Sequence, residues 1–91
     1  MGRETVLFKS KEPKAATDVA TILRQLADKI EQGQLTLRQG DQEVTLSFSQ
    51  QMTLEISVEE EIKTTHRQQS LEVEIEWYVG ESEGPDSTVI V

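Results

Sequence analysis

The chain contains no cysteine, and this absence excludes disulfide bonds and metal sites built from thiolate ligands. His66 is the only histidine, so there is no second imidazole to activate a serine nucleophile and no cluster of histidine ligands. Gly33 and Gly40 stand alone at the ends of expected elements and form no glycine-rich phosphate loop. We therefore expect a protein that is not an enzyme, uses no cofactor and has no dedicated metal centre.

Long apolar runs are also absent. No stretch of the sequence approaches the roughly 18 apolar residues that cross a membrane. The first residues, MGRETVLFKSKEP, lack the apolar segment of a secretory signal. These features predict a cytoplasmic, soluble protein without membrane contacts, and a length of 91 residues predicts one domain.

Positive charge is scarce in the second half of the chain. Residues 1–51 carry seven basic and seven acidic side chains, whereas residues 52–91 carry ten acidic and two basic ones, so the net charge of −8 belongs to the second half. A surface of this sign repels phosphate backbones, and we expect no nucleic-acid binding. Basic proteins or cations are the partners it favours; the alternative is that the charge serves only solubility.

Two segments, 52–63 and 70–79, alternate between apolar residues and polar, mostly acidic ones, with Glu60 as the exception. This period of two is typical of strands with one buried face, and the two segments predict a hairpin. With Lys63 opposite Ser70, apolar residues face each other, and so do acidic ones such as Glu59 and Glu74 or Glu61 and Glu72. Trp77 is then expected in the core beside Ile56. The outward, acidic side of this hairpin is the candidate interaction surface, made of Glu55, Glu59, Glu61, Glu72, Glu74, Glu76 and Tyr78.

Glu60 departs from the alternation, because its parity directs it to the apolar side. We expect it to lie beyond the end of whatever covers that side. His66 is expected in a solvated loop, residues 64–69, with no catalytic role.

A helix and a second hairpin are predicted ahead of the acidic one. Apolar residues recur at steps of three and four up to Ile30, and Gly33 follows as the stop signal. The helix is expected to start near Ser10, with Pro13 in its first turn. Segment 4–10 is a candidate strand before it. After the helix, Gly40-Asp41 predicts a two-residue type II′ turn that pairs Leu37 with Val44 and Arg38 with Glu43.

The next connection, Ser49-Gln50-Gln51, predicts a turn that aligns Leu46 with Leu54 and joins both hairpins in one antiparallel meander. The segment after Val79 is rich in glycine and acidic residues and predicts a flexible tail.

The order of these features resembles one family. The sequence ATILRQLADKIEQG at 20–33 is followed by LTL at 35–37, ISVEEEIK at 56–63 and LEVEIEW at 71–77. This arrangement over residues 3–79 is similar to the amphi-Trp domain family of bacteria and archaea. The resemblance implies a small α+β fold, and because no activity or catalytic residue is established for that family, it implies no mechanism.

The expected fold class is α+β, with one amphipathic helix on one face of a mostly antiparallel sheet of four to five strands, in the order β-α-β-β-β-β. Residues 1–79 form the expected domain and residues 80–91 the acidic tail. The expected function is a non-enzymatic protein-interaction module, a monomer or weak homodimer, whose acidic sheet face binds a basic protein. The alternative is a domain that binds a divalent cation through the same glutamates.

Overall fold

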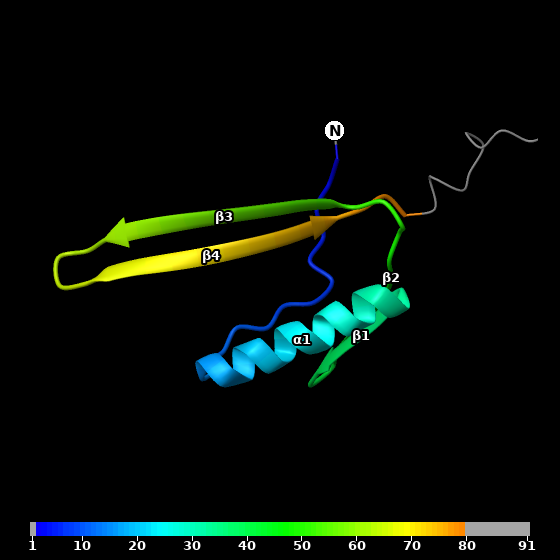
Figure 1. The fold of residues 1–91 in the computed structure, drawn as a ribbon, viewed down its shortest axis with the longest axis horizontal. Helices are drawn as coiled ribbons and strands as arrows, with labels where there is room; N and C mark the ends of the chain where they lie inside the picture. Colours follow the sequence, from blue (N-terminus) through cyan, green and yellow to red (C-terminus); the bar gives the residue numbers. More distant parts are fainter. Residues whose placement is uncertain (1, 80–91) are drawn as a thin grey trace, which may run out of the picture. The chain divides into compact units, whose positions relative to one another are not determined.

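The computed structural model describes residues 2–79 and contains two compact units, one ending at Phe48 and the other beginning at Ser49 (Figure 1). The first unit contains helix α1 (Ala16–Gln32) and the strands β1 (Gln34–Gln39) and β2 (Gln42–Ser47). The second contains the strands β3 (Thr53–Ile62) and β4 (Arg67–Glu76). An α+β composition is confirmed. The expected tail, residues 80–91, lies outside the described residues, and the one-domain expectation stays a prediction.

Helix α1 ends where the sequence predicts but starts later. Gly33 adopts a left-handed conformation (φ 92°), and its N–H donates to the carbonyls of Lys29 and Ile30 at 2.9 and 3.1 Å. At the other end, Ala15 has extended backbone and no side chain caps the helix. Its carbonyl accepts the first hydrogen bonds, from the N–H groups of Asp18 and Val19 at 3.0 Å each. The predicted start near Ser10 is therefore wrong, because the chain stays extended past Pro13.

The first hairpin has the predicted register. Leu37 lies opposite Val44 and Arg38 opposite Glu43, across a turn in which Gly40 has a φ of 57°. No described non-glycine residue has positive φ, so Asp41 does not, which fits a type II′ turn rather than type I′.

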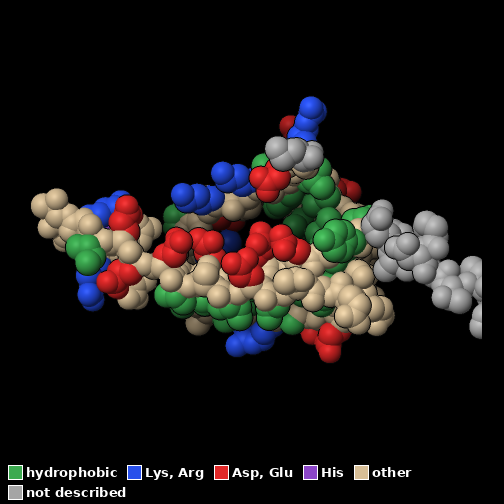
Figure 2. Space-filling view, turned by 90° about the horizontal axis from the view of Figure 1, so that it is seen from above, with side chains coloured by type: hydrophobic (Ala, Val, Ile, Leu, Met, Phe, Trp, Pro, Cys, Tyr) green, Lys and Arg blue, Asp and Glu red, His purple; other side chains and the backbone are tan. Residues whose placement is uncertain are grey.

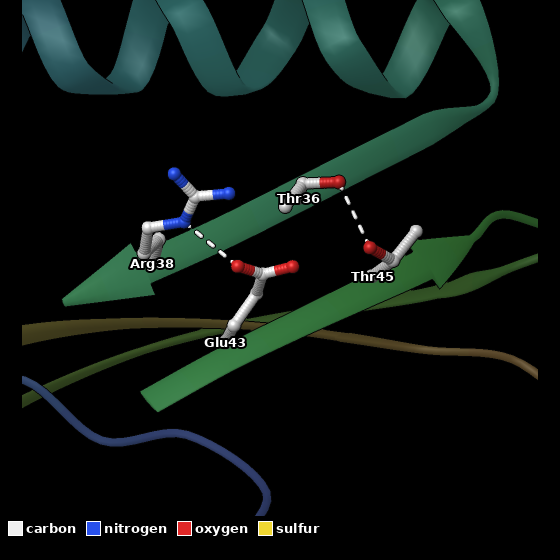
Figure 3. Close-up of polar contacts among 4 residues, drawn as sticks. All are labelled: Thr36, Arg38, Glu43 and Thr45. Atoms are coloured by element: carbon white, nitrogen blue, oxygen red, sulfur yellow. Dashed lines mark hydrogen bonds and ion pairs between the residues drawn. The ribbon is translucent and has the colours of Figure 1, made fainter. Parts of the chain in front are cut away.

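Polar pairs cross this hairpin on its outer face (Figure 3). Arg38 Nε donates to Glu43 Oε1 at 2.7 Å, and the hydroxyls of Thr36 and Thr45 lie 2.9 Å apart. The other side is half-buried and contains Leu35, Leu37, Val44 and Leu46, and α1 contacts β1. Leu26 and Ile30 of the helix are half-buried in the same unit.

The predicted first strand, residues 4–10, is not formed. Residues 2–15 adopt neither helix nor strand. The Gln42 side chain takes the place of a neighbouring strand at one point: its amide accepts from the N–H of Lys9 and donates to the Lys9 carbonyl, both at 3.0 Å. The element order therefore begins with the helix and not with a strand. The segment is held at Lys9 by one side-chain amide, and it forms no ladder of backbone hydrogen bonds with another strand.

The second hairpin forms as predicted but in a different register. β3 pairs antiparallel with β4, with Glu59 opposite Ser70 and Val58 opposite Leu71. The strands are joined by a tight turn in which the N–H of Lys63 donates to the carbonyl of His66 at 2.8 Å. β4 therefore starts at Arg67, inside the segment predicted as loop, and the predicted pairs of Glu59 with Glu74 and of Glu61 with Glu72 are wrong.

The expected single sheet is not confirmed. The described strands form two separate two-stranded sheets, β1–β2 and β3–β4. At the end of β2 the N–H of Phe48 donates to the carbonyl of Gly33 at 2.9 Å, and the N–H of Gln51 then donates to Ser49 Oγ at 3.3 Å. The described strands include no β2–β3 ladder, so the expected turn between the two hairpins stays a prediction. Among the described residues no side chain is fully buried. Helix α1 contacts β1, and the expected packing of the helix on one four- to five-stranded sheet is not confirmed.

Candidate functional site

The candidate site is the outward side of the β3–β4 hairpin, which we call the acidic face. Alternation along the two strands places six carboxylates on this side (Glu55, Glu59, Glu61, Glu72, Glu74 and Glu76). All six side chains are exposed, and acidic side chains gather along the hairpin in the space-filling view (Figure 2). Tyr78 follows just beyond the end of β4 and is 81% exposed. The structure thus brings together the carboxylates selected from the sequence.

The observed register spreads these charges along the face. Glu55 and Glu74 are the only pair of carboxylates directly opposite each other in the β3–β4 ladder. Glu59 lies opposite Ser70 and Glu61 opposite Gln68. Because directly opposed like charges destabilise a sheet by roughly 0.2–1 kcal/mol per pair, this register keeps the acidic face at a smaller energetic cost than the predicted one.

An open hollow lies in the middle of the acidic face. It has a volume of about 680 Å³, and its polar lining consists of Glu55, Ser57, Glu59, Glu72 and Glu74. Ser57 lies opposite Glu72 and is the smallest side chain in the outward row of β3, between two glutamates. A short side chain surrounded by four carboxylates leaves room for one cationic side chain to approach several oxygens.

Sequence reasoning missed Ser57. The signal was present, because Ser57 interrupts the outward row of glutamates between Glu55 and Glu61 in β3. The hollow around Ser57 could not be predicted, however, because the predicted register places Glu76 opposite Ser57, whereas Glu72 lies there in the structure.

A second hollow lies at the base of the same hairpin. It has a volume of about 420 Å³ and is lined by Gln51, Met52, Thr53, Glu76, Trp77 and Tyr78. Trp77 is half-buried here, beyond the end of the ladder. The expected position of Trp77 beside Ile56 is wrong, because Val73 occupies that place in the observed register.

Basic side chains are few near the acidic face. Lys63 Nζ lies 3.5 Å from Glu61 Oε1. Within residues 2–79, no ion pair is formed by Glu55, Glu59, Glu72 or Glu76. Arg67 approaches Glu60, at 3.8 Å, on the opposite side of the hairpin. The acidic face therefore retains most of its negative charge.

The carboxylates do not converge on a point. In the described part of the chain, no three His, Cys, Asp or Glu side chains are placed to hold one metal ion. His66 lies in the β3–β4 turn, where its Nδ1 is 2.9 Å from the hydroxyl of Thr65, and its side chain is exposed. No specific observation favours the divalent-cation alternative.

Helix α1 is too short and too polar to cross a membrane, and residues 2–79 contain no other helix.

Comparison with known proteins gives one result. No curated protein and no solved structure matches the sequence. The model of the Amphi-Trp domain matches residues 1–91, which also includes the segment after Val79 that the quoted motifs do not reach. The resemblance inferred from the motifs is confirmed, and the chain belongs to the Amphi-Trp domain family.

Proposed function

We propose that this domain is a non-enzymatic interaction module whose acidic face binds a lysine- or arginine-rich segment of a partner protein. The observation that carries the proposal is the hollow around Ser57, where four carboxylates surround one small residue on an exposed sheet. Charge-assisted hydrogen bonds between guanidinium or ammonium groups and carboxylates are roughly twice as strong as neutral ones. One basic side chain at this position reaches carboxylates of both strands.

The rest of the face supports an extended basic ligand. Carboxylates run from Glu76, opposite Thr53 near the base, to Glu61, opposite Gln68 near the turn, over nine rungs of the ladder. At a rise of about 3.3 Å per residue, the acidic face is long enough to contact several basic residues of one segment. Tyr78 offers an exposed ring beside Glu76, suited to a cation–π contact with a lysine or arginine.

The first test is a titration of a fluorescent arginine- and lysine-rich peptide. The test variant changes Glu55, Glu59, Glu72 and Glu74 to Gln, which removes four charges from the hollow. A matched control changes four acidic residues of the first unit (Glu4, Glu12, Asp18 and Glu31) to their amides, which alters the net charge by the same amount. We expect the test variant to lose at least about tenfold in affinity and the control much less, because only the test variant removes carboxylates of the proposed binding surface.

Salt dependence gives an independent check. Affinity of the wild type should fall as salt rises, and the four-residue variant should show a weaker dependence. Equal losses in the two variants would mean that only net charge matters. An affinity unaffected by salt would exclude the acidic face as the binding surface. Capture from the native lysate, with the test variant as the negative bait, then identifies the partner.

A further inference from the structure

The side of the β3–β4 hairpin opposite the acidic face is apolar and open; we call it the apolar face. Three successive rungs are apolar on both strands: Leu54 with Ile75, Ile56 with Val73, and Val58 with Leu71. Exposed fractions are 60% for Leu54, 61% for Ile56, 70% for Val58, 68% for Leu71 and 54% for Val73. A two-stranded hairpin is marginally stable in water by itself, so this face needs a cover.

The apolar face ends at a defined point. In the next rung Gln69 Nε2 donates to Glu60 Oε1 at 2.8 Å, and Arg67 Nη1 lies 3.8 Å from Glu60 Oε2. Whatever covers the face therefore stops before Glu60. From the base of the hairpin, where Met52 and Trp77 line one hollow, to Val58, the apolar face spans about 20 Å at about 3.3 Å per residue.

Helix α1 has too little open apolar surface to match this face. Its open apolar residues are Val19, Ile22 and Leu23, which are 43%, 44% and 55% exposed. They lie within five residues, or about 6 Å of helix axis. The stripe further along the helix, at Leu26 and Ile30, is already half-buried in the unit where α1 contacts β1. The open part of the helix is about one third as long as the apolar face.

A second copy of the hairpin matches it in length, width and residue type. Five of the six rung residues are more than half exposed, whereas Ile75, Met52 and Trp77 are already covered over most of their surface. At on the order of 100 Å² per open side chain, the face offers roughly 500 Å² per copy, or about 1,000 Å² for two copies. A contact of this size lies at the lower end of specific protein–protein interfaces and fits a weak dimer.

We propose that two copies of the chain associate through their apolar faces, hairpin against hairpin, in a closed two-fold dimer. Face-to-face sheets pack about 10 Å apart, and the two acidic faces then point away from each other. Their charges are separated by more than the screening length of about 8 Å, so the acidic faces do not oppose association. The polar rung of Glu60 and Gln69 lies past the edge of the contact. This inference is independent of the proposed partner binding, which uses the other face.

Sedimentation equilibrium over a roughly hundredfold range of protein concentration tests the proposal. We expect the wild type to approach twice the chain mass of 10.3 kDa. Val73→Ala should raise the dissociation constant on the order of 10- to 100-fold, because the lost methyl groups occur twice in a two-fold interface. Ser70→Ala, in the same strand but on the acidic face, is the matched control and should leave the constant unchanged.

Leu23→Ala reports on the helix in the same experiment. It should leave dimerisation intact, because the proposed contact uses only the β3–β4 hairpin. A wild type that stays at 10.3 kDa at every concentration overturns the proposal, and a segment of the same chain is then the cover. A dimer unaffected by Val73→Ala also overturns it, because association then uses another surface.

Discussion

Neutralising Glu55 should stabilise the fold while weakening partner binding. Glu55 and Glu74 are directly opposite in the β3–β4 ladder, and both side chains are exposed. Two unit charges about 7 Å apart in water repel by roughly 0.6 kcal/mol, within the range of about 0.2–1 kcal/mol for like charges across a sheet. Glu55→Gln removes this repulsion and keeps the size of the side chain. For a domain of this length, the gain corresponds to a rise of roughly 1–8 °C in the melting temperature.

The assay is thermal unfolding followed by circular dichroism at fixed protein concentration. Glu59→Gln is the matched control, because Glu59 lies opposite Ser70 and faces no carboxylate directly across the ladder; its nearest carboxylates are Glu61 along the strand and Glu72 on the diagonal. It should gain less than Glu55→Gln. The difference should be largest at low salt and should vanish near 1 M salt, where the screening length is about 3 Å. A Glu55→Gln variant that melts at or below the wild-type temperature at low salt would refute the reasoning.

Three further predictions concern the first unit. Gly33→Ala should cost about 1–2 kcal/mol in unfolding free energy, because an added Cβ has open space around it and only the left-handed φ of 92° is strained; Gly2→Ala should be neutral in the same urea titration. Gln42→Leu should release Lys9, seen as faster amide hydrogen exchange at Lys9 with little change at β1. Arg38→Gln should lower the unfolding free energy by no more than about 1 kcal/mol, because its 2.7 Å ion pair is exposed, and a larger loss would show a further role.

Local patterns in the sequence were sufficient to predict the helix end, both hairpins and the composition of the acidic face. Gly33 and Gly40 occupy the two positive-φ positions of the described residues, and such positions are recognisable because other residues rarely adopt them. Alternation with a period of two then assigns each residue of β3 and β4 to one side. These predictions depend only on neighbours along the chain.

Register and strand partners could not be predicted in the same way. Any shift of β4 by an even number of residues keeps apolar residues facing apolar ones, so alternation does not choose between Ser70 and Glu74 as the partner of Glu59. The choice depends on the turn, closed by the bond from Lys63 to His66, and on the pair of Glu60 and Gln69. The Leu46–Leu54 alignment stays a prediction, because the described strands form two separate sheets and a plausible turn sequence does not by itself establish a ladder between them.

The acidic side and the apolar side of the β3–β4 hairpin have opposite effects on its stability. The acidic side carries repulsion that the apolar side must offset, and the apolar side is more than half exposed at five of its six rung residues. If the proposed dimer forms, burial of the apolar face supplies that stabilisation and also presents two acidic faces in opposite directions. Two binding surfaces on one rigid body raise the apparent affinity for a partner with repeated basic segments, provided that the segments can reach both sides. The Val73→Ala variant should then lose apparent affinity for a tandem basic peptide long enough to span the dimer while keeping its affinity for the single peptide.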